Sequence, residues 1–349
     1  MGEDGHDPPG IDGDRVGQWF EAHAGGAVEL PLRFARIEGG LSNLTYHVCD
    51  GAGRRWVLRR PPLHGVIQSA HDMAREHRII AALADSDVPV PPVVGHCDDE
   101  DVTGAEFYVM DFVPGPVYRT AQMVEAETDQ ALRRRIAMSL IDTLAALHEV
   151  DPDAVGLGDL GRRADYCARQ LRRWRRQWEH VATSDLPAFV EVHERLCADV
   201  PAQTGVAIVH GDYRLDNLIL SPDGDVAAVV DWELCTLGDP LADVGILCAY
   251  WADPDDTFRT LPQASTHLPG FLRRGELVDR YAERSGRDVS DIAFYLALAY
   301  WRLAAILQGV YSRFASGAYG RAHPDIESFP QRIERLVDAA HAMTVRSGH

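Results

Sequence analysis

A short stretch of the chain places one amide and two carboxylate side chains at spacings that suit phosphoryl transfer. Asp212 lies five residues ahead of Asn217, and Asp231 ends a later apolar run. Mg²⁺ prefers hard oxygen ligands and takes one or two of them from protein, a share that Asn217 and Asp231 can supply. Asp212, kept free of the metal, can accept a proton from an attacking hydroxyl. We therefore take Asp212, Asn217 and Asp231 as candidate catalytic residues, and Asn217 and Asp231 as candidate metal ligands.

A predicted β-hairpin positions these groups. Two apolar, β-branched runs, Leu218–Leu220 and Val226–Val230, flank the sequence Ser221-Pro222-Asp223-Gly224. Proline and Asp-Gly are turn formers, so the pattern indicates an antiparallel hairpin. Because a hairpin brings its two open ends together, we expect Asn217 and Asp231 to lie side by side. His210, Gly211 and Asp212 come just before, on a loop.

The stretch that contains Asp212, Asn217 and Asp231 resembles the aminoglycoside phosphotransferase and choline kinase family. The loops of that family read H-G-D-x-x-x-x-N and are followed by a strand that ends in Val/Ile-Asp-Trp. The loop is also similar to H-R-D-x-x-x-x-N of protein kinases, with Gly211 in place of arginine. Asp231-Trp232-Glu233 and Gly238-Asp239-Pro240 resemble one branch in particular. That branch contains the kinase-like domain fused to some acyl-CoA dehydrogenases and many stand-alone actinobacterial proteins. The resemblance runs from about residue 37 to about residue 317.

The resemblance implies an α/β (α+β) fold, bilobal and protein-kinase-like. It implies a small β-rich nucleotide-binding N-lobe at 12–113 and a larger, mainly helical C-lobe at 114–349. The composition of residues 1–11 predicts a flexible tail. ATP would be the co-substrate with Mg²⁺ as cofactor, and GTP stays open. Asp243 would support the catalytic loop by hydrogen bonds, His210 would buttress it, and Trp232 would pack.

The expected N-lobe offers a nucleotide site. Strands are predicted at 34–38, 45–49 and 55–59, with Gly39-Gly40-Leu41-Ser42-Asn43 between the first two. Small loop residues let backbone N–H groups and a hydroxyl approach phosphate oxygens, so Gly39, Gly40, Ser42 and Asn43 are candidate phosphate contacts. The strand expected at 107–113 would end in the hinge, where backbone groups of Asp111, Phe112 and Val113 would bind adenine.

The chain contains no lysine, because all 34 basic residues are arginine. The lysine that contacts nucleotide phosphates in kinases therefore needs a substitute. Arg59 shares a strand face with Val57 by the strand period of two, which favours Arg59 over Arg60. Glu76, on a helix expected at 69–84, is the predicted partner of Arg59.

The helical half suggests an anionic acceptor. The segment 165–180 has one apolar stripe and one basic stripe, the latter made of Arg169, Arg172, Arg173 and Arg176. A solvated face with scattered ion pairs is the ordinary alternative. Arg302, in a long apolar helix expected at 291–315, is either a buried structural partner or a substrate contact. The candidate substrate contacts are Arg169, Arg173, Glu233 and Arg302.

Composition narrows the class of protein. The 349 residues are 46% hydrophobic and 25% charged, as in soluble globular proteins. The formal charge of -19 argues against a nucleic-acid or anionic-membrane binder. The six cysteines form no C-x-x-C pair, and the acidic start MGEDGHDPPG lacks the apolar region of a signal peptide, so reduced thiols and a cytoplasmic location are expected. No membrane-spanning helix is expected, because Arg302 interrupts the longest apolar run.

Three other functions stay open at this stage. They are alternatives to the first choice, a kinase for a hydroxy acid or hydroxyacyl-CoA. The charge of -19 would suit an antibiotic phosphotransferase that acts on cationic aminoglycosides, or on macrolides. The missing lysine and the minimal glycine loop would suit a nucleotide-binding pseudokinase without turnover. A Zn²⁺ hydrolase is suggested only by the 15 histidines, and no H-x-x-x-H or H-E-x-x-H pattern lies on a predicted helix.

Overall fold

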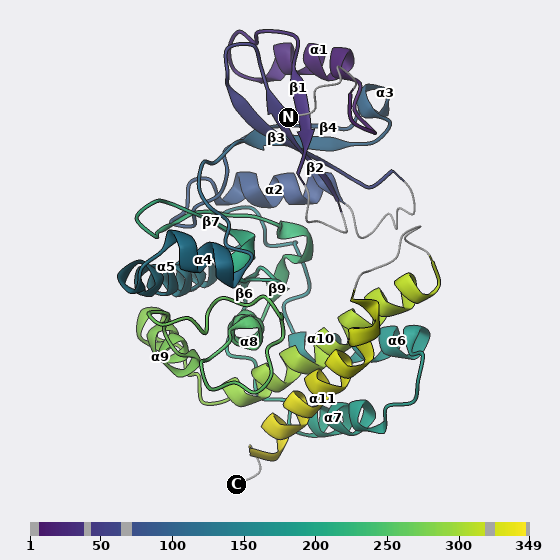
Figure 1. The fold of residues 1–349 in the computed structure, drawn as a ribbon, viewed down its shortest axis with the longest axis vertical. Helices are drawn as coiled ribbons and strands as arrows, with labels where there is room; N and C mark the ends of the chain where they lie inside the picture. Colours follow the sequence, from purple (N-terminus) through teal and green to yellow (C-terminus); the bar gives the residue numbers. More distant parts are fainter. Residues whose placement is uncertain (1–6, 38–42, 64–71, 318–324, 347–349) are drawn as a thin grey trace. The chain divides into compact units, whose positions relative to one another are not determined.

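The computed structural model of the protein describes residues 7–37, 43–63, 72–317 and 325–346 (Figure 1). The chain divides into two compact units, which we describe separately. The first unit comprises Met1–Pro116 and Ala227–Glu233, and the second comprises Val117–Val226 and Leu234–His349. Asp231 and Glu233 thus belong to the β-rich first unit.

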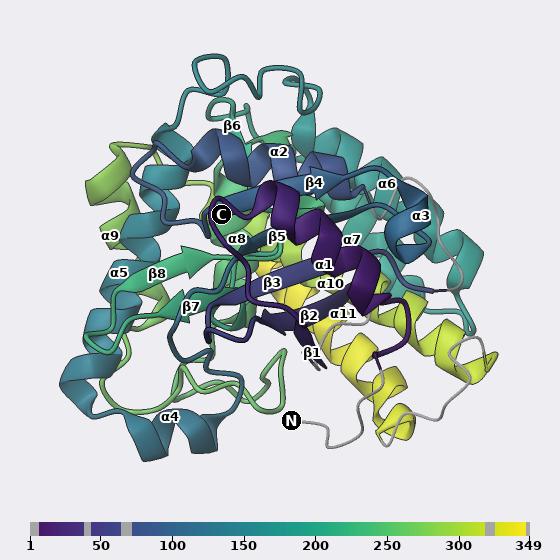
Figure 2. The same ribbon diagram turned by 90° about the horizontal axis from the view of Figure 1, so that it is seen from above.

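The first unit is built on a five-stranded antiparallel sheet in the order β1-β2-β3-β5-β4. Its elements are α1 (Gly13–His23), β1 (Arg33–Arg36), β2 (Leu44–Cys49), β3 (Arg55–Arg60), α2 (Met73–Leu83), β4 (Val93–Cys97), α3 (Glu100–Thr103) and β5 (Phe107–Asp111). Figure 2 shows α1 lying across the strands. Strands alternate their side chains between two faces, so one face meets α1 and the other faces away from it.

The face under α1 forms the core of the first unit. Buried residues of α1, β2, β3 and β5 meet there: Val16, Trp19, Phe20, Tyr46, Val48, Trp56, Leu58, Phe107 and Val109. Aromatic rings pack edge to face within it, as between Phe20 and Trp56 at 5.2 Å. Because Trp56 and Leu58 point into this core, Val57 and Arg59 point to the opposite face of β3.

Most elements expected in the first unit are present, with shifted ends. α2 begins at Met73 because the Asp72 carboxylate accepts the Arg75 N–H at 2.8 Å as an N-cap; residues 69–71 of the expected helix lie outside the described residues. β5 ends at Asp111 rather than Val113.

The described part of the expected flexible tail is anchored. The Tyr46 hydroxyl donates to the Pro9 carbonyl at 2.6 Å, and Arg60 donates to the Gly10 carbonyl. Ile11 packs against the α1 core. Backbone carbonyls and one apolar side chain thus hold residues 9–11 in place.

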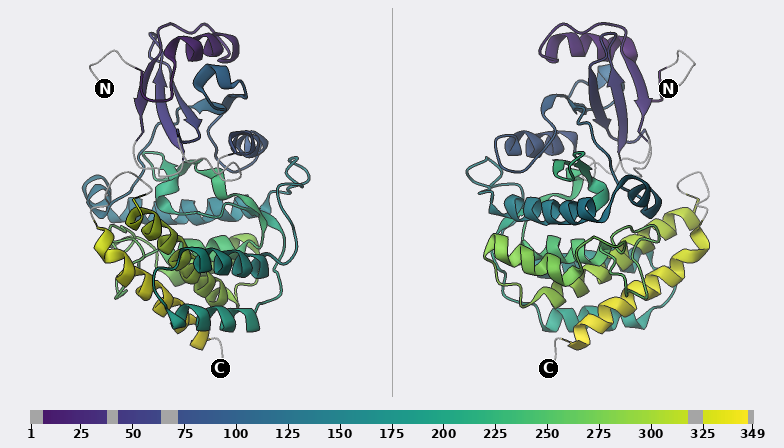
Figure 3. Two further views of the ribbon diagram at one scale, coloured as in Figure 1. Left: turned by 90° about the vertical axis from the view of Figure 1, so that its right-hand side faces the viewer. Right: turned by 60° about the vertical axis from the view of Figure 1, so that its left-hand side comes forward.

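The second unit is mainly helical, and α10 and α11 lie side by side in it (Figures 1 and 3). Its helices are α4 (Ala121–Glu127), α5 (Gln130–Glu149), α6 (Tyr166–Val181), α7 (Pro187–Ala198), α8 (Leu241–Tyr250), α9 (Arg274–Ser285), α10 (Ile292–Ala315) and α11 (Phe329–Arg346). Strands β6 (Ala207–Val209) and β9 (Thr236–Gly238) pair antiparallel. This small ladder carries the segment 210–217, which follows β6 directly.

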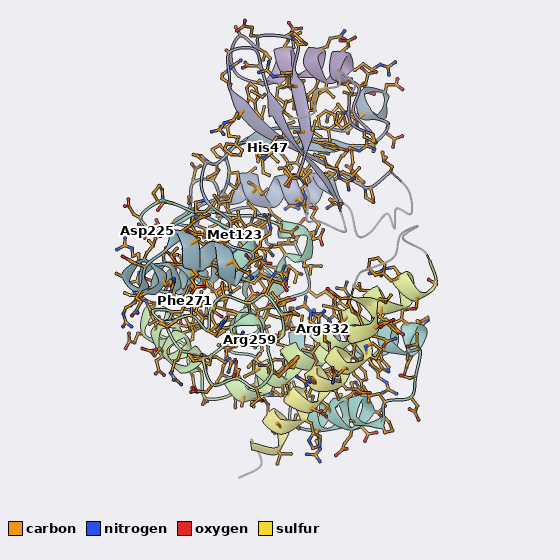
Figure 4. All side chains as sticks on the ribbon, in the orientation of Figure 1. His47, Met123, Asp225, Arg259, Phe271 and Arg332 are labelled. Atoms are coloured by element: carbon orange, nitrogen blue, oxygen red, sulfur yellow. The ribbon has the colours of Figure 1, made fainter. Side chains whose placement is uncertain are left out.

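The predicted hairpin is confirmed. β7 (Leu218–Leu220) and β8 (Val226–Val229) form a two-stranded sheet. Ser221 N–H donates to the Asp225 carbonyl at 2.8 Å and so closes the turn. Arg135 of α5 binds the Asp225 carboxylate with two hydrogen bonds of 2.8 Å; Figure 4 labels Asp225 among the side chains.

Helix α10 is long and apolar enough to cross a membrane by length and composition, contrary to the expectation from Arg302. Its apolar window is 72% buried inside the protein, as in the core helix of a globular protein. Arg302 and Gln308 are themselves buried. All six cysteines are unpaired thiols, as predicted.

Candidate active site

In the first unit, three carboxylates surround the guanidinium of Arg59. Its Nε lies 3.0 Å from Glu76 Oε2, and its NH2 lies 2.6 Å from Asp231 Oδ1 and 3.5 Å from Glu233 Oε2. The predicted Arg59–Glu76 pair is therefore present. Arg60 instead donates to backbone carbonyls, among them Thr103 at 2.6 Å. The strand register thus selects Arg59, as the period of two predicts.

Two neutral side chains tie this cluster together. Asn43 Nδ2 donates to Glu76 Oε1 at 3.0 Å and to Glu233 Oε2 at 3.3 Å, and the Tyr108 hydroxyl donates to Glu76 Oε2 at 3.1 Å. Glu76 is only 2% exposed, which makes its charge costly without partners. Burial raises the pKa of Glu76, although the charge of Arg59 opposes this. Burial works to lower the pKa of Arg59, but Glu76, Asp231 and Glu233 reverse the effect, so its net pKa is raised.

Asp231 has an uncommon backbone conformation. Its φ is 69°, in the left-handed region that a non-glycine residue occupies at some cost, and such outliers gather at functional sites. Its Oδ1 is engaged by Arg59, while its Oδ2 makes no hydrogen bond or ion pair with another described residue. The side chain is 32% exposed. One carboxylate oxygen is thus available for a hard cation.

In the second unit, the buried carboxylate of Asp243 holds the start of the segment 210–217, which we call the catalytic loop after the role predicted for it. Its Oδ2 accepts the His210 N–H at 2.6 Å and its Oδ1 accepts the Gly211 N–H at 2.8 Å. Asp243 lies in the first turn of α8, where the helix dipole favours negative charge. His148 Nε2 lies 3.4 Å from Asp243 Oδ2, and its Nδ1 lies 2.8 Å from the Tyr281 hydroxyl. The loop support predicted for Asp243 is confirmed.

Gly211 allows the loop its path. Its φ is 84°, and an added Cβ would lie 2.7 Å from the Leu234 carbonyl oxygen. A side chain at this position would therefore strain both the backbone and its neighbour. The requirement explains why glycine stands here instead of the arginine of the protein-kinase loop.

Asp212 and Asn217 face each other across the loop. Asn217 Nδ2 donates to the Asp212 carbonyl at 2.9 Å and to Asp212 Oδ2 at 3.1 Å. This assigns the Asn217 amide oxygen to the other side, where it makes no hydrogen bond with a described residue. His210 is fully buried, and its Nδ1 accepts the Asp212 N–H at 3.2 Å, as expected of a buttress. The carboxylate and the amide oxygen are thereby pre-positioned.

Sequence reasoning missed Arg214. Its Nε lies 3.6 Å from Asp212 Oδ2, its NH2 lies 2.6 Å from Asp216 Oδ2, and its guanidinium sits 4.8 Å from the Tyr250 ring centroid. The alternation of Asp212, Arg214 and Asp216 in the sequence was the available signal. The stacking on Tyr250 had none, because Tyr250 comes from α8.

Two of the candidate substrate arginines gather around one aromatic ring. The guanidinium of Arg302 lies 5.3 Å from the Trp174 ring centroid and that of Arg173 lies 5.2 Å from it. Arg302 NH2 also donates to the Gly211 carbonyl at 2.8 Å, while its Nε is buried without a partner among the described residues. Burial and the nearby Arg302 lower the pKa of Arg173. Arg169 donates to the Arg162 carbonyl at 2.6 Å.

The remaining candidate nucleotide contacts belong to the glycine-containing loop and to the expected hinge. Gly39, Gly40 and Ser42 lie outside the described residues. At the expected hinge, the Phe112 N–H donates to the Arg55 carbonyl at 3.2 Å, which leaves Asp111 and Val113 as the other predicted adenine contacts. No group of three or more His, Cys, Asp or Glu side chains suited to a metal ion is found in the described part of the chain.

Comparison with known proteins agrees with this arrangement. The profile of the Phosphotransferase enzyme family matches residues 33–305. Acyl-CoA dehydrogenase family member 10 of Mus musculus is 37% identical over 300 residues, which cover 82% of this chain and 27% of that protein. The chain spans between 27% and 41% of the length of the curated relatives that it matches.

Solved structures show the same fold. A presumed aminoglycoside phosphotransferase from Ralstonia eutropha JMP134 has a TM-score of 0.80 and 32% identity, covering 96% of this chain and 99% of that one. A spectinomycin phosphotransferase, in complex with ADP and spectinomycin, has a TM-score of 0.62 at 11% identity, covering 95% of this chain and 98% of that one.

Replacing Arg59 by methionine should destabilise the protein, because Glu76 would keep a buried charge without its counter-ion. Breaking such a pair costs about 3–5 kcal/mol. In the variant, the pKa of Glu76 should be higher than in the wild type, because Arg59 no longer opposes the effect of burial. Above the ordinary carboxyl pKa, the folded state then holds a proton on Glu76 that the unfolded state has lost. Its stability should therefore fall as the pH increases above the ordinary carboxyl pKa. Urea unfolding at several pH values measures this. Arg36→Met, on exposed β1, is the control, and equal losses in both variants would refute the account.

Replacing Asp243 by asparagine should loosen the catalytic loop. An amide offers one acceptor oxygen, so the His210 or Gly211 N–H would lose its partner at a cost of about 1–3 kcal/mol. Hydrogen–deuterium exchange should speed up in peptides that cover 207–217. The exposed Asp225→Asn variant should leave exchange there unchanged. Unaltered protection in Asp243→Asn would show that this carboxylate does not hold the loop.

Proposed function

Because this chain belongs to the phosphotransferase enzyme family, we propose that it transfers the γ-phosphoryl group of ATP to a hydroxyl group of a small molecule. The observation that carries the proposal is the catalytic loop, in which Asp243 fixes the backbone and Asn217 orients the Asp212 carboxylate. Such positioning supplies most of the catalysis in phosphoryl transfer.

Asp212 orients the acceptor hydroxyl and receives its proton. As the hydroxyl oxygen forms its bond to the γ-phosphorus, the bond between that phosphorus and the β,γ-bridging oxygen breaks. ADP leaves with the bridging oxygen, and the acceptor becomes a phosphomonoester. The proton passes from Asp212 to solvent. Arg214 Nε, 3.6 Å from Asp212 Oδ2, places a positive charge beside this carboxylate.

The residues present suit Mg²⁺, since Asp231 Oδ2 and the Asn217 amide oxygen are both hard donors without partners among the described residues. When bound with the nucleotide, the ion would neutralise charge on the β- and γ-phosphates. Asn217 and Asp231 would hold it. Arg59, with Asn43 and the loop at 39–42, would contact the phosphates, which requires the Arg59 guanidinium to exchange carboxylate partners for phosphate oxygens.

We further propose that the acceptor is anionic, a hydroxy acid or its CoA thioester. Support comes from Arg173 and Arg302 around Trp174, and from the unpartnered buried Nε of Arg302. The curated relatives are longer proteins that are named as acyl-CoA dehydrogenase family members. Their names support an acyl compound as the acceptor. Arg169 and Glu233 stay predicted substrate contacts, although Glu233 is engaged by Arg59 and Asn43.

An antibiotic phosphotransferase is the second candidate. It is favoured by the likeness at 32% identity to the presumed aminoglycoside phosphotransferase of R. eutropha. Its polycationic acceptors require carboxylates, whereas the arginines around Trp174 would repel them. Acceptor competition between a hydroxy acid and an aminoglycoside separates the two candidates.

Asp212→Asn should retain binding of Mg-ADP while acceptor-dependent ADP release falls by about 10²–10⁴-fold, because the amide cannot take the hydroxyl proton. Calorimetry measures the first quantity and a coupled ADP assay the second. Asp225→Asn, on the hairpin turn, is the matched control with full activity. Unchanged turnover in Asp212→Asn would remove Asp212 as the base.

A further inference from the structure

Two buried side chains behind Asp243, those of His148 and Tyr281, have no role in the function proposed so far. His148 lies in the last turn of α5 and Tyr281 lies in α9. The two helices pack side by side in the second unit (Figure 1). The His148 side chain is 0% exposed, and Tyr281 is also fully buried. Because neither side chain reaches solvent, their polar atoms depend on partners inside the protein.

The contacts of the His148 ring assign its tautomer. Its Nε2 lies 3.4 Å from Asp243 Oδ2. Both oxygens of Asp243 already accept backbone N–H groups, so the carboxylate acts as an acceptor and Nε2 carries a proton. In a neutral imidazole Nδ1 then accepts a hydrogen bond, and the Tyr281 hydroxyl lies 2.8 Å from it. The opposite tautomer would set the Nε2 lone pair against a carboxylate oxygen.

Tyr281 suits the role of the donor to Nδ1. Burial raises the pKa of Tyr281; the charge of Arg287 opposes this effect and that of Asp243 adds to it, so the hydroxyl keeps its hydrogen. The main chain of His148 is held as well, because Arg287 NH2 donates to the His148 carbonyl at 3.0 Å. The ring is thus fixed from two directions, with its Nε2–H aimed at Asp243.

The carboxylate of Asp243 connects this pair to the catalytic loop. Its Oδ2 receives both the His210 N–H, at 2.6 Å, and the His148 Nε2–H, while its Oδ1 receives the Gly211 N–H at 2.8 Å. The terminal torsion of an aspartate is broad, so the additional donor on Oδ2 narrows the range of carboxylate orientations. Rotation of the carboxylate would lengthen a bond to the backbone that leads into Asp212.

We propose that His148 and Tyr281 are positioning residues of the phosphoryl transfer. Tyr281 keeps His148 in the Nε2–H tautomer, His148 fixes the orientation of the Asp243 carboxylate, and Asp243 holds the loop that presents Asp212. The inference rests on the proposed function, because the loop must carry the base for its position to matter. The alternative is a pair that only fastens α5 to α9 and has no effect on the loop.

Two substitutions of His148 separate these roles. Glutamine can place an amide N–H near the Nε2 position, whereas asparagine reaches only the Nδ1 position. Hydrogen–deuterium exchange in peptides that cover 207–217 should speed up about three- to tenfold in His148→Asn, the factor of one hydrogen bond, and stay near the wild-type rate in His148→Gln. Thr260→Val is the matched control in the same unit, since it loses one buried hydroxyl bond to the Ala249 carbonyl, and it should leave this exchange unchanged. Equal exchange rates in the two His148 variants would overturn the proposal.

A double variant tests whether His148 acts through Asp243. Because Asp243→Asn already loosens the loop, adding His148→Asn should speed the exchange of 207–217 by no further factor, as expected for residues of one network. If the two factors multiply instead, His148 acts independently of Asp243 and the proposal is wrong.

NMR of the full chain labelled with ¹⁵N-histidine reads the tautomer directly. Above the ordinary imidazole pKa of about 6.5, His148 should show a protonated Nε2 and a bare Nδ1, and its signals are identified by their loss in His148→Gln. A proton on Nδ1 in place of Nε2 would contradict the assignment.

Tyr281→Phe removes only the hydroxyl and should speed the exchange of 207–217 as His148→Asn does. Wild-type exchange in this variant would overturn the role of Tyr281. These measurements need no acceptor, so their failure with ADP release intact would reject the inference alone. Failure of the proposed function would appear in the Asp212→Asn comparison.

Discussion

Three carboxylates converge on one guanidinium in the β-rich unit, and the candidate nucleotide side of the site depends on that balance of charge. Glu76 is buried and Asp231 has a left-handed backbone, so each carries a cost that the ion pairs with Arg59 offset. Arginine suits this place because its planar group serves several carboxylates at once, which an ammonium group does less well. A chain without lysine can therefore keep a kinase-like site.

The helical unit relies on the opposite arrangement, one buried carboxylate that serves several donors. Asp243 accepts two consecutive backbone N–H groups, and His148 with Tyr281 extends the network behind it. Hydrogen bonds in such a buried setting rigidify the groups they join. The loop can then present Asp212 and Asn217 without rearrangement, which is what positioning catalysis requires. Gly211 is the backbone condition for this loop path.

Sequence reasoning succeeded where spacing along the chain determines geometry. The hairpin follows from its turn residues, and the choice of Arg59 over Arg60 follows from the strand period. The pairing of Arg59 with Glu76 was implied by the resemblance to kinases. It did not find contacts between residues far apart in sequence, such as Asn43 with Glu233 or Arg214 with Tyr250. The start of α2 depends on a cap at Asp72, and the anchoring of residues 9–11 depends on backbone carbonyls, which leave no compositional trace. The hydrogen bonds around the candidate residues Asp212, Asn217 and Asp231 could therefore not be predicted from the sequence.

The most direct test of the account is phosphorus NMR of the chain with Mg-ATP and a panel of acceptors: hydroxy acids, hydroxyacyl-CoAs, choline, aminoglycosides and macrolides. The account predicts that one anionic, hydroxyl-bearing acceptor yields ADP and a phosphomonoester in equal amounts, and that neither forms without Mg²⁺. Tight nucleotide binding with no phosphomonoester from any acceptor would contradict it. A phosphorylated aminoglycoside as the sole product would keep the chemistry and reject the anionic acceptor.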